Sequence, residues 1–221
     1  MANVFSSTIG KKLIMSLSGL FLITFLLVHL SANLTMLVSS DLYNEGCHFM
    51  ATNPFIKIME PVLALGFFVH IVYALILTLR NMKSRPVGYA VKKDCNSSTW
   101  SSRNMLILGA FLVTFILVHM MNFWWKMKIS GDIGMTTVNG VEMHDGFTLV
   151  TSLFQIWWYD VIYIASFVFL GLHLTHGFWS AFQTVGLNNN KWYPRLKTIG
   201  TIYAIIVVGG FTIIPLFFLL Q

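Results

Sequence analysis

Five apolar stretches, each long enough to cross a bilayer, occupy most of this 221-residue sequence. A helix needs about 20 consecutive apolar residues to span the hydrocarbon core. The stretches cover residues 12–38, 58–80, 104–126, 157–184 and 198–220. Only 10% of the residues are charged, whereas a soluble domain has about 25%. The sequence therefore predicts an all-α, polytopic membrane protein with five transmembrane helices in one domain, residues 1–221.

The basic residues lie mainly on one side of this predicted topology. Eleven lysines and arginines lie at the start of the first helix or in the 80–103 and 185–197 regions, and three lie on the other side. Cytoplasmic loops carry an excess of such residues, which predicts a cytoplasmic N-terminus and an external C-terminus. The basic 81–103 loop has two compatible interpretations. It can attract anionic lipid, and it can be the docking site of a cytoplasmic subunit. The external segment 127–156 is polar and glycine-rich, which predicts a loop.

A pattern of eleven residues that ends on histidine occurs twice. Residues 19–29 read GLFLITFLLVH and residues 109–119 read GAFLVTFILVH, with eight identical positions that include glycine, threonine and histidine. Chance similarity between apolar helices explains the shared aliphatic residues but explains the other matches less well. An ionisable residue within a membrane segment is costly and usually functional. The repeat therefore predicts a shared role for His29 and His119.

Histidines occur in each of the first four predicted helices, at positions His29, His70, His119, His173 and His176. With a rise of about 1.5 Å per residue, His29 and His119 both lie roughly 24–25 Å from the cytoplasmic edge. The same rise places His70 and His173 in the inner half of the membrane. Histidines on facing helices of a bundle are suited to hold planar metal cofactors. We therefore predict two bis-histidine haems, an outer one on His29 and His119 and an inner one on His70 and His173.

Two alternatives stay open at this point. His176 is a rival to His173, because the two lie on one helix face, but His176 is one turn nearer the cytoplasm and matches the depth of His70 less well. The histidines also fit a proton relay or polar helix contacts in a haem-free transporter. Against a transporter, the carboxylates nearest the membrane, Glu60 and Asp160, are predicted at helix ends.

The chain resembles the di-haem cytochrome b membrane anchor of bacterial succinate dehydrogenase and fumarate reductase, in its single-subunit, five-helix form. The resemblance covers essentially the whole chain. It rests on SGLFLITFLLVHLSANL, GFFVHIVYALIL, the VH of the third helix and GLHLTHGFWSAFQT. The fourth haem ligand of this family is a histidine four residues before a glycine. His173 and Gly177 match that pattern, whereas His176 does not.

The resemblance implies two haem b cofactors, with menaquinone as the substrate of this subunit. It also implies that a flavoprotein carrying FAD and an iron–sulfur subunit dock on the cytoplasmic face of the bacterial inner membrane. The flavoprotein would interconvert succinate and fumarate, so no dicarboxylate site is expected in this chain. Its other predicted partner is membrane lipid, and no nucleic acid is expected.

Quinone chemistry also needs a proton donor or acceptor near the outer haem. In related fumarate reductases this group is an acidic residue in the loop between the first two helices. That loop offers Asp41, Glu45 and Glu60 here, and its position favours Glu45. An ordinary solvated loop carboxylate is the competing interpretation. The di-haem cytochrome b of a hydrogenase or formate dehydrogenase remains an alternative for the whole protein, because it uses similar histidine pairs with different motif spacing.

Overall fold

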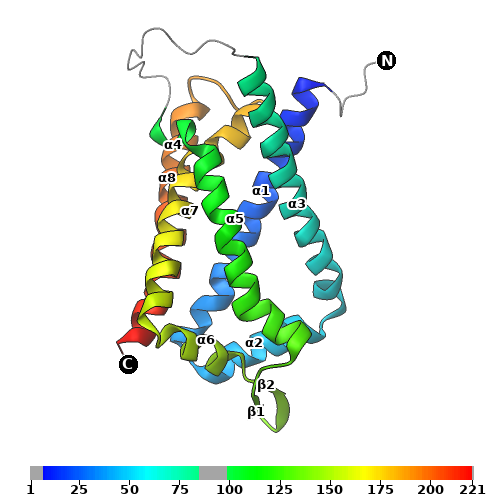
Figure 1. The fold of residues 1–221 in the computed structure, drawn as a ribbon, viewed down its shortest axis with the longest axis vertical. Helices are drawn as coiled ribbons and strands as arrows, with labels where there is room; N and C mark the ends of the chain where they lie inside the picture. The colour runs from blue at the N-terminus through cyan, green and yellow to red at the C-terminus, as the bar shows by residue number, and fades with distance from the viewer. Residues whose placement is uncertain (1–6, 85–98, 221) are drawn as a thin grey trace.

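The computed structural model describes residues 7–84 and 99–220, and its long helices form a bundle (Figure 1). These helices are α1 (Thr8–Leu34), α3 (Pro54–Lys83), α5 (Met105–His119), α7 (Trp157–Thr184) and α8 (Trp192–Leu219). Further helical turns extend α1 to Leu37 and α5 to Ser130, and all five spans are long and apolar enough to cross a membrane. The predicted all-α, multi-pass membrane fold is therefore confirmed. Most of the predicted docking loop, residues 85–98, lies outside the described residues.

Local capping and interfacial residues set the helix boundaries, which differ from the predicted ones. The Asn53 side chain accepts hydrogen bonds from the backbone N–H groups of Phe55 and Ile56, so α3 begins at Pro54 rather than at residue 58. Likewise, α8 begins at Trp192, six residues before the apolar stretch. The Arg195 guanidinium lies 5.7 Å from the centre of the Trp192 ring, so this polar first turn pairs a cation with an aromatic ring.

The third membrane-spanning segment changes helix type immediately after His119. Two π-helical turns, η3 (Met120–Trp124) and η4 (Lys126–Ser130), continue the segment past residue 126, where the apolar stretch ends. Gly131 then adopts φ +65°, a left-handed conformation that ends the helix. Such π-helical turns are rare in proteins and occur frequently beside functional sites.

Short elements cover the end of the bundle where the sequence predicts loops. They are η2 (Thr35–Leu37), α2 (Ser40–Thr52), the strands β1 (Met135–Val138) and β2 (Val141–His144), and α6 (Gly146–Phe154). The Asn44 amide donates to Asp145 Oδ1 at 3.2 Å and accepts from the Phe147 N–H at 2.9 Å, which joins α2 to α6. Partial burial raises the pKa of Asp145, but hydrogen bonds from Thr148 and Asn44 outweigh it and lower the pKa below its ordinary value.

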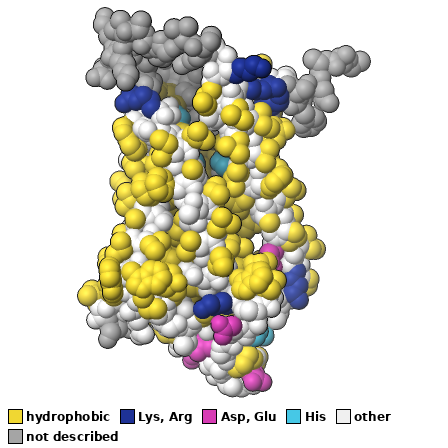
Figure 2. Space-filling view, in the orientation of Figure 1, with side chains coloured by type: hydrophobic (Ala, Val, Ile, Leu, Met, Phe, Trp, Pro, Cys, Tyr) yellow, Lys and Arg dark blue, Asp and Glu magenta, His cyan; other side chains and the backbone are white. Residues whose placement is uncertain are grey.

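Charge is distributed unequally between the two ends of the bundle (Figure 2). The end that holds the start of α1, the end of α3 and α4 (Trp100–Arg103) carries most of the lysines and arginines of the described chain. The opposite end, with the strands and α6, carries all of its carboxylates: Asp41, Glu45, Glu60, Asp132, Glu142, Asp145 and Asp160. We call these the basic end and the acidic end.

Buried side chains are concentrated on α7 and α8, whereas α3 has none among its 30 residues. Helix α7 packs on α8, α1 and α5, and α8 is joined to α1 by the Tyr203 hydroxyl, which donates to the Ile23 carbonyl at 2.6 Å. Helix α3 packs mainly on α1. The bundle is therefore tight around α7 and α8 and loose around α3.

Replacing Gly171 by leucine is expected to destabilise this tight side. A Cβ atom at Gly171 would lie 2.7 Å from Val208 Cγ2, so a larger side chain must push α7 and α8 apart. Overpacking of this kind costs about 1–3 kcal/mol. We expect a lower thermal midpoint in detergent for Gly171→Leu than for the control Gly209→Leu, because no atom lies within 4 Å of a Cβ there. Equal midpoints for the two variants would contradict the packing described.

Candidate functional site

The outer histidine pair joins α1 to α5. The rings of His29 and His119 have their centroids 5.7 Å apart and are nearly perpendicular, with an interplanar angle of 89°. Each ring also contacts the phenylalanine one turn earlier, Phe25 at 5.3 Å and Phe115 at 5.7 Å between centroids. The two copies of the sequence repeat thus build the same local unit, a histidine packed on its own phenylalanine.

The inner pair joins α3 to α7. The ring centroids of His70 and His173 are 6.4 Å apart, with an interplanar angle of 65°. A Cβ atom at Gly19 would lie 3.4 Å from His70 Cε1, so the absence of a side chain there lets α1 approach the ring. The structure therefore brings together the histidines that the depth argument grouped, one pair nearer the acidic end and one nearer the basic end.

Two side chains of α1 contact the Nδ1 atoms of these histidines. The Ser18 hydroxyl lies 3.3 Å from His70 Nδ1 and 3.0 Å from the Met15 carbonyl, so the imidazole is the donor to Ser18 when the hydroxyl donates to that carbonyl. That tautomer leaves Nε2 of His70 unprotonated and available to a metal. The Asn33 amide lies 3.4 Å from His29 Nδ1 and donates to the His29 carbonyl at 2.8 Å.

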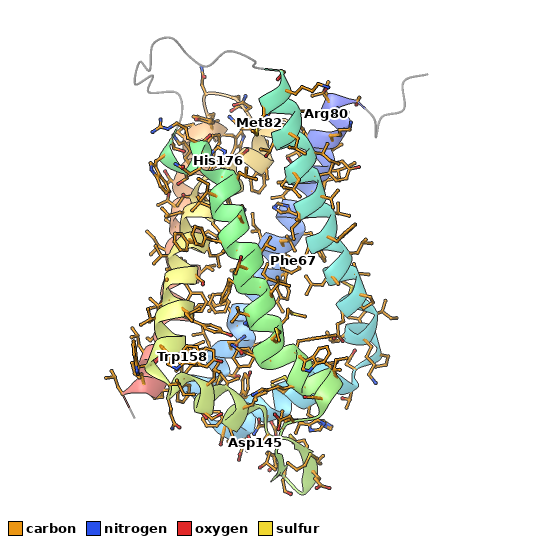
Figure 3. All side chains as sticks on the ribbon, viewed as in Figure 1. Phe67, Arg80, Met82, Asp145, Trp158 and His176 are labelled. Carbon is orange, nitrogen blue, oxygen red and sulfur yellow. The ribbon has the colours of Figure 1, made fainter. Side chains whose placement is uncertain are left out.

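The other histidines of the bundle contain buried nitrogens without partners. Nδ1 of His119, His173 and His176 is buried and has no hydrogen-bond partner in the described chain. The His176 ring contacts Trp179, with centroids 4.9 Å apart, and lies near the basic end, close to the level of Arg80 (Figure 3). His173, and not this rival, is therefore the α7 residue whose ring faces His70.

The ring separations of both pairs match those of two imidazoles that bind one metal from opposite sides. An imidazole nitrogen binds a first-row metal at about 2 Å, so two imidazoles on opposite sides of one metal have ring centroids about 6 Å apart. The observed separations of 5.7 and 6.4 Å bracket that value.

An aromatic cluster surrounds His119, and sequence reasoning did not find it. Tyr163, at its centre, is 1% exposed and accepts a hydrogen bond from the Asn122 amide at 3.1 Å. Its ring contacts the rings of Phe115, His119, Phe123, Phe154 and Phe167. The spacing of Tyr163 and Phe167, four residues apart on one helix face, was the available signal in the sequence.

Three carboxylates at the acidic end differ in their surroundings. Glu45 is exposed, and its Oε1 accepts a hydrogen bond from the Asn139 amide at 2.6 Å. Glu60 accepts hydrogen bonds from the Trp124 indole at 2.6 Å and from the Lys128 ammonium at 3.0 Å, which ties α3 to η3 and η4. Asp160, in the first turn of α7, is 2% exposed, and neither of its oxygens has a hydrogen-bond partner in the described chain.

Searches of protein-family models, curated proteins and solved structures found no match to this chain. The chemistry of the site must therefore be inferred from its residues. Neutral imidazoles in facing pairs are ligands for haem iron, and two such pairs at different depths suit electron transfer across a membrane.

Proposed function

We propose that this chain is the di-haem cytochrome b anchor of a bacterial succinate:quinone oxidoreductase, a succinate dehydrogenase or fumarate reductase. The observation that carries the proposal is the arrangement of four histidines from four helices in two facing pairs, with centroids 5.7 and 6.4 Å apart. The sequence motifs around these histidines, which resemble those of this family, supply the choice of enzyme.

In this proposal His29 and His119 hold an outer haem b, and His70 and His173 hold an inner one. A bound haem supplies one-electron redox chemistry. The protein would supply the axial imidazoles, and Ser18 would hold one of them, His70, in the tautomer that is protonated at Nδ1. Phenylalanine and tyrosine rings around His119 exclude water from the outer pair.

The unequal charge of the two ends supports an orientation in the bacterial inner membrane. The basic end would face the cytoplasm, together with the N-terminus, and receive the flavoprotein and iron–sulfur subunits. Electrons would then pass between the iron–sulfur subunit and menaquinone, which binds nearer the acidic end. Glu45, which is exposed at that end, would take part in proton transfer during quinone turnover.

Purification of the tagged chain from native membranes tests this proposal. We expect a flavoprotein and an iron–sulfur protein to co-purify, and we expect succinate to reduce b-type haem in the complex. Co-purification of a hydrogenase or formate dehydrogenase subunit would favour the other di-haem cytochromes. A complex without a b-type absorption band would contradict both cytochrome assignments and favour a haem-free transporter.

Removal of the Ser18 hydroxyl is expected to raise the midpoint potential of the inner haem. The imidazole of His70 donates from Nδ1 to this hydroxyl, which makes the ring a stronger electron donor and stabilises oxidised iron. We expect a rise of roughly 20–60 mV for Ser18→Ala, from a hydrogen bond worth about 1 kcal/mol and one transferred electron. Spectroelectrochemical titration measures this shift.

Ser31→Ala is the matched control on the same helix. The Ser31 hydroxyl is exposed and donates to the Leu27 carbonyl at 2.8 Å, so its loss is expected to leave both midpoint potentials unchanged. An unchanged inner potential in Ser18→Ala, or an equal shift in both variants, would contradict the role given to Ser18.

A further inference from the structure

We propose that Asp160 is the carboxyl group that exchanges a proton with the quinone ring at the acidic end of the bundle. The proposal rests on the proposed function and adds a substrate-contacting residue to it. Sequence reasoning placed Asp160 at a helix end and favoured Glu45, whose carboxylate is exposed. Asp160 has the opposite environment, because only 2% of the residue is exposed.

The carboxyl group of Asp160 lacks the partners that the neighbouring acids have. The Glu45, Glu60 and Asp145 carboxylates each accept hydrogen bonds from other side chains. Both Asp160 oxygens are buried without any hydrogen-bond partner in the described chain. Burial without a partner disfavours the ionised carboxylate, which favours the protonated group or a partner from outside the chain. A neutral carboxylic acid is a hydrogen-bond donor, which is what a quinone oxygen accepts.

The position of Asp160 connects it to the outer histidine pair. Residues three and four apart share a helix face, so Asp160 lies on the same face of α7 as Tyr163, one turn nearer the acidic end. The Tyr163 ring contacts His119, with centroids 6.1 Å apart. Phe123 and Phe154 also contact Tyr163 and each other, so the surroundings between Asp160 and the outer histidine pair are apolar and aromatic.

Succinate supplies two electrons through the partner subunits, and the quinone takes them up with two protons. The O–H bond of Asp160 breaks, and its proton goes to one quinone oxygen. Water at the acidic end then reprotonates the carboxylate and supplies the second proton. In quinol oxidation the carboxylate takes a proton from a quinol hydroxyl instead.

Substitution of Asp160 in the whole complex tests the role in turnover. We expect Asp160→Asn to lower succinate:quinone activity at least a hundredfold, while succinate oxidation by an artificial dye and the haem content stay at wild-type levels. Asp160→Glu should recover part of the quinone activity. Glu142→Gln, an exposed acid on β2, is the matched control and should behave as wild type. Unchanged quinone activity in Asp160→Asn would overturn the inference alone, whereas a wild-type complex that does not oxidise succinate would overturn the proposed function.

A labelling experiment on the wild-type protein needs no variant and no haem readout. Dicyclohexylcarbodiimide reacts with protonated carboxyl groups in apolar surroundings, and mass spectrometry locates the adduct. We expect Asp160 to be labelled, and we expect a short-chain naphthoquinone to reduce the labelling several-fold. An Asp160 that is not labelled, or a labelling yield that the naphthoquinone leaves unchanged, would overturn the inference even if Asp160→Asn fails to assemble.

Discussion

Replacement of His173 by alanine is expected to remove one of two haems, whereas His176→Ala retains both. The two histidines lie one turn apart on α7 and both have a buried Nδ1 without a partner. Only the His173 ring faces His70, with centroids 6.4 Å apart, and the His176 ring contacts Trp179. The measurement is the haem-to-protein ratio of the purified variants, together with the reduced-minus-oxidised spectrum.

The His173 and His176 variants act as controls for each other, because each removes one imidazole from the same helix. A half-maximal b-type band in His173→Ala, beside a full band in His176→Ala, is the expected pattern. The reverse pattern would make His176 the ligand and would require α7 to turn relative to α3. Retention of both haems in both variants would exclude α7 from the inner site.

The second large effect is expected at the outer pair. His29→Ala and His119→Ala should each remove the outer haem, and the double variant should lose no more than either single variant. The reason is that both rings serve one site, with centroids 5.7 Å apart, so the two substitutions are not additive. The measurement is again the haem-to-protein ratio, and the exposed His144 on β2 provides the control His144→Ala.

The double variant also tests the pairing itself. Loss of both haems in His29→Ala/His119→Ala, with one lost in each single variant, would show that the two histidines serve different haems. Loss of haem in His144→Ala would indicate general destabilisation, and the single variants would then carry no information about ligation.

The apolar stretches were sufficient to predict the five membrane helices, because length and hydropathy determine which segments can span a bilayer. The elements at the acidic end could not be predicted in this way. Helix α2 depends on caps such as Ser39, which accepts from the Leu42 N–H at 3.0 Å. The turn between the strands depends on Asn139 and Gly140, both with positive φ. Single capping and turn residues of this kind are harder to recognise in a sequence than a long apolar stretch.

The repeat shows which parts of a site the sequence can reveal. Its phenylalanines and histidines form the same contact in both copies. Its threonines do not belong to the site, because Thr24 and Thr114 are exposed and each donates to the carbonyl one turn earlier at 3.1 Å. The repeat is identical at all these positions, and only the packing of the helices distinguishes a ring that faces another helix from an exposed hydroxyl.

Depth along a helix could be calculated from the sequence, but the direction of each side chain could not. The rise per residue grouped His70 with His173, and the packing of α3 and α7 on α1 then brings their rings together. Asp160 is the opposite case. Its place in the first turn of α7 suggests an interfacial carboxylate, and its burial depends on tertiary packing that no local pattern indicates.

The haem content of the purified chain tests the central claim most directly. The proposal predicts two b-type haems per chain, both low-spin in electron paramagnetic resonance because each iron would have two imidazole ligands. A preparation from cells supplied with haem precursor that is folded, monodisperse and free of haem would contradict the account.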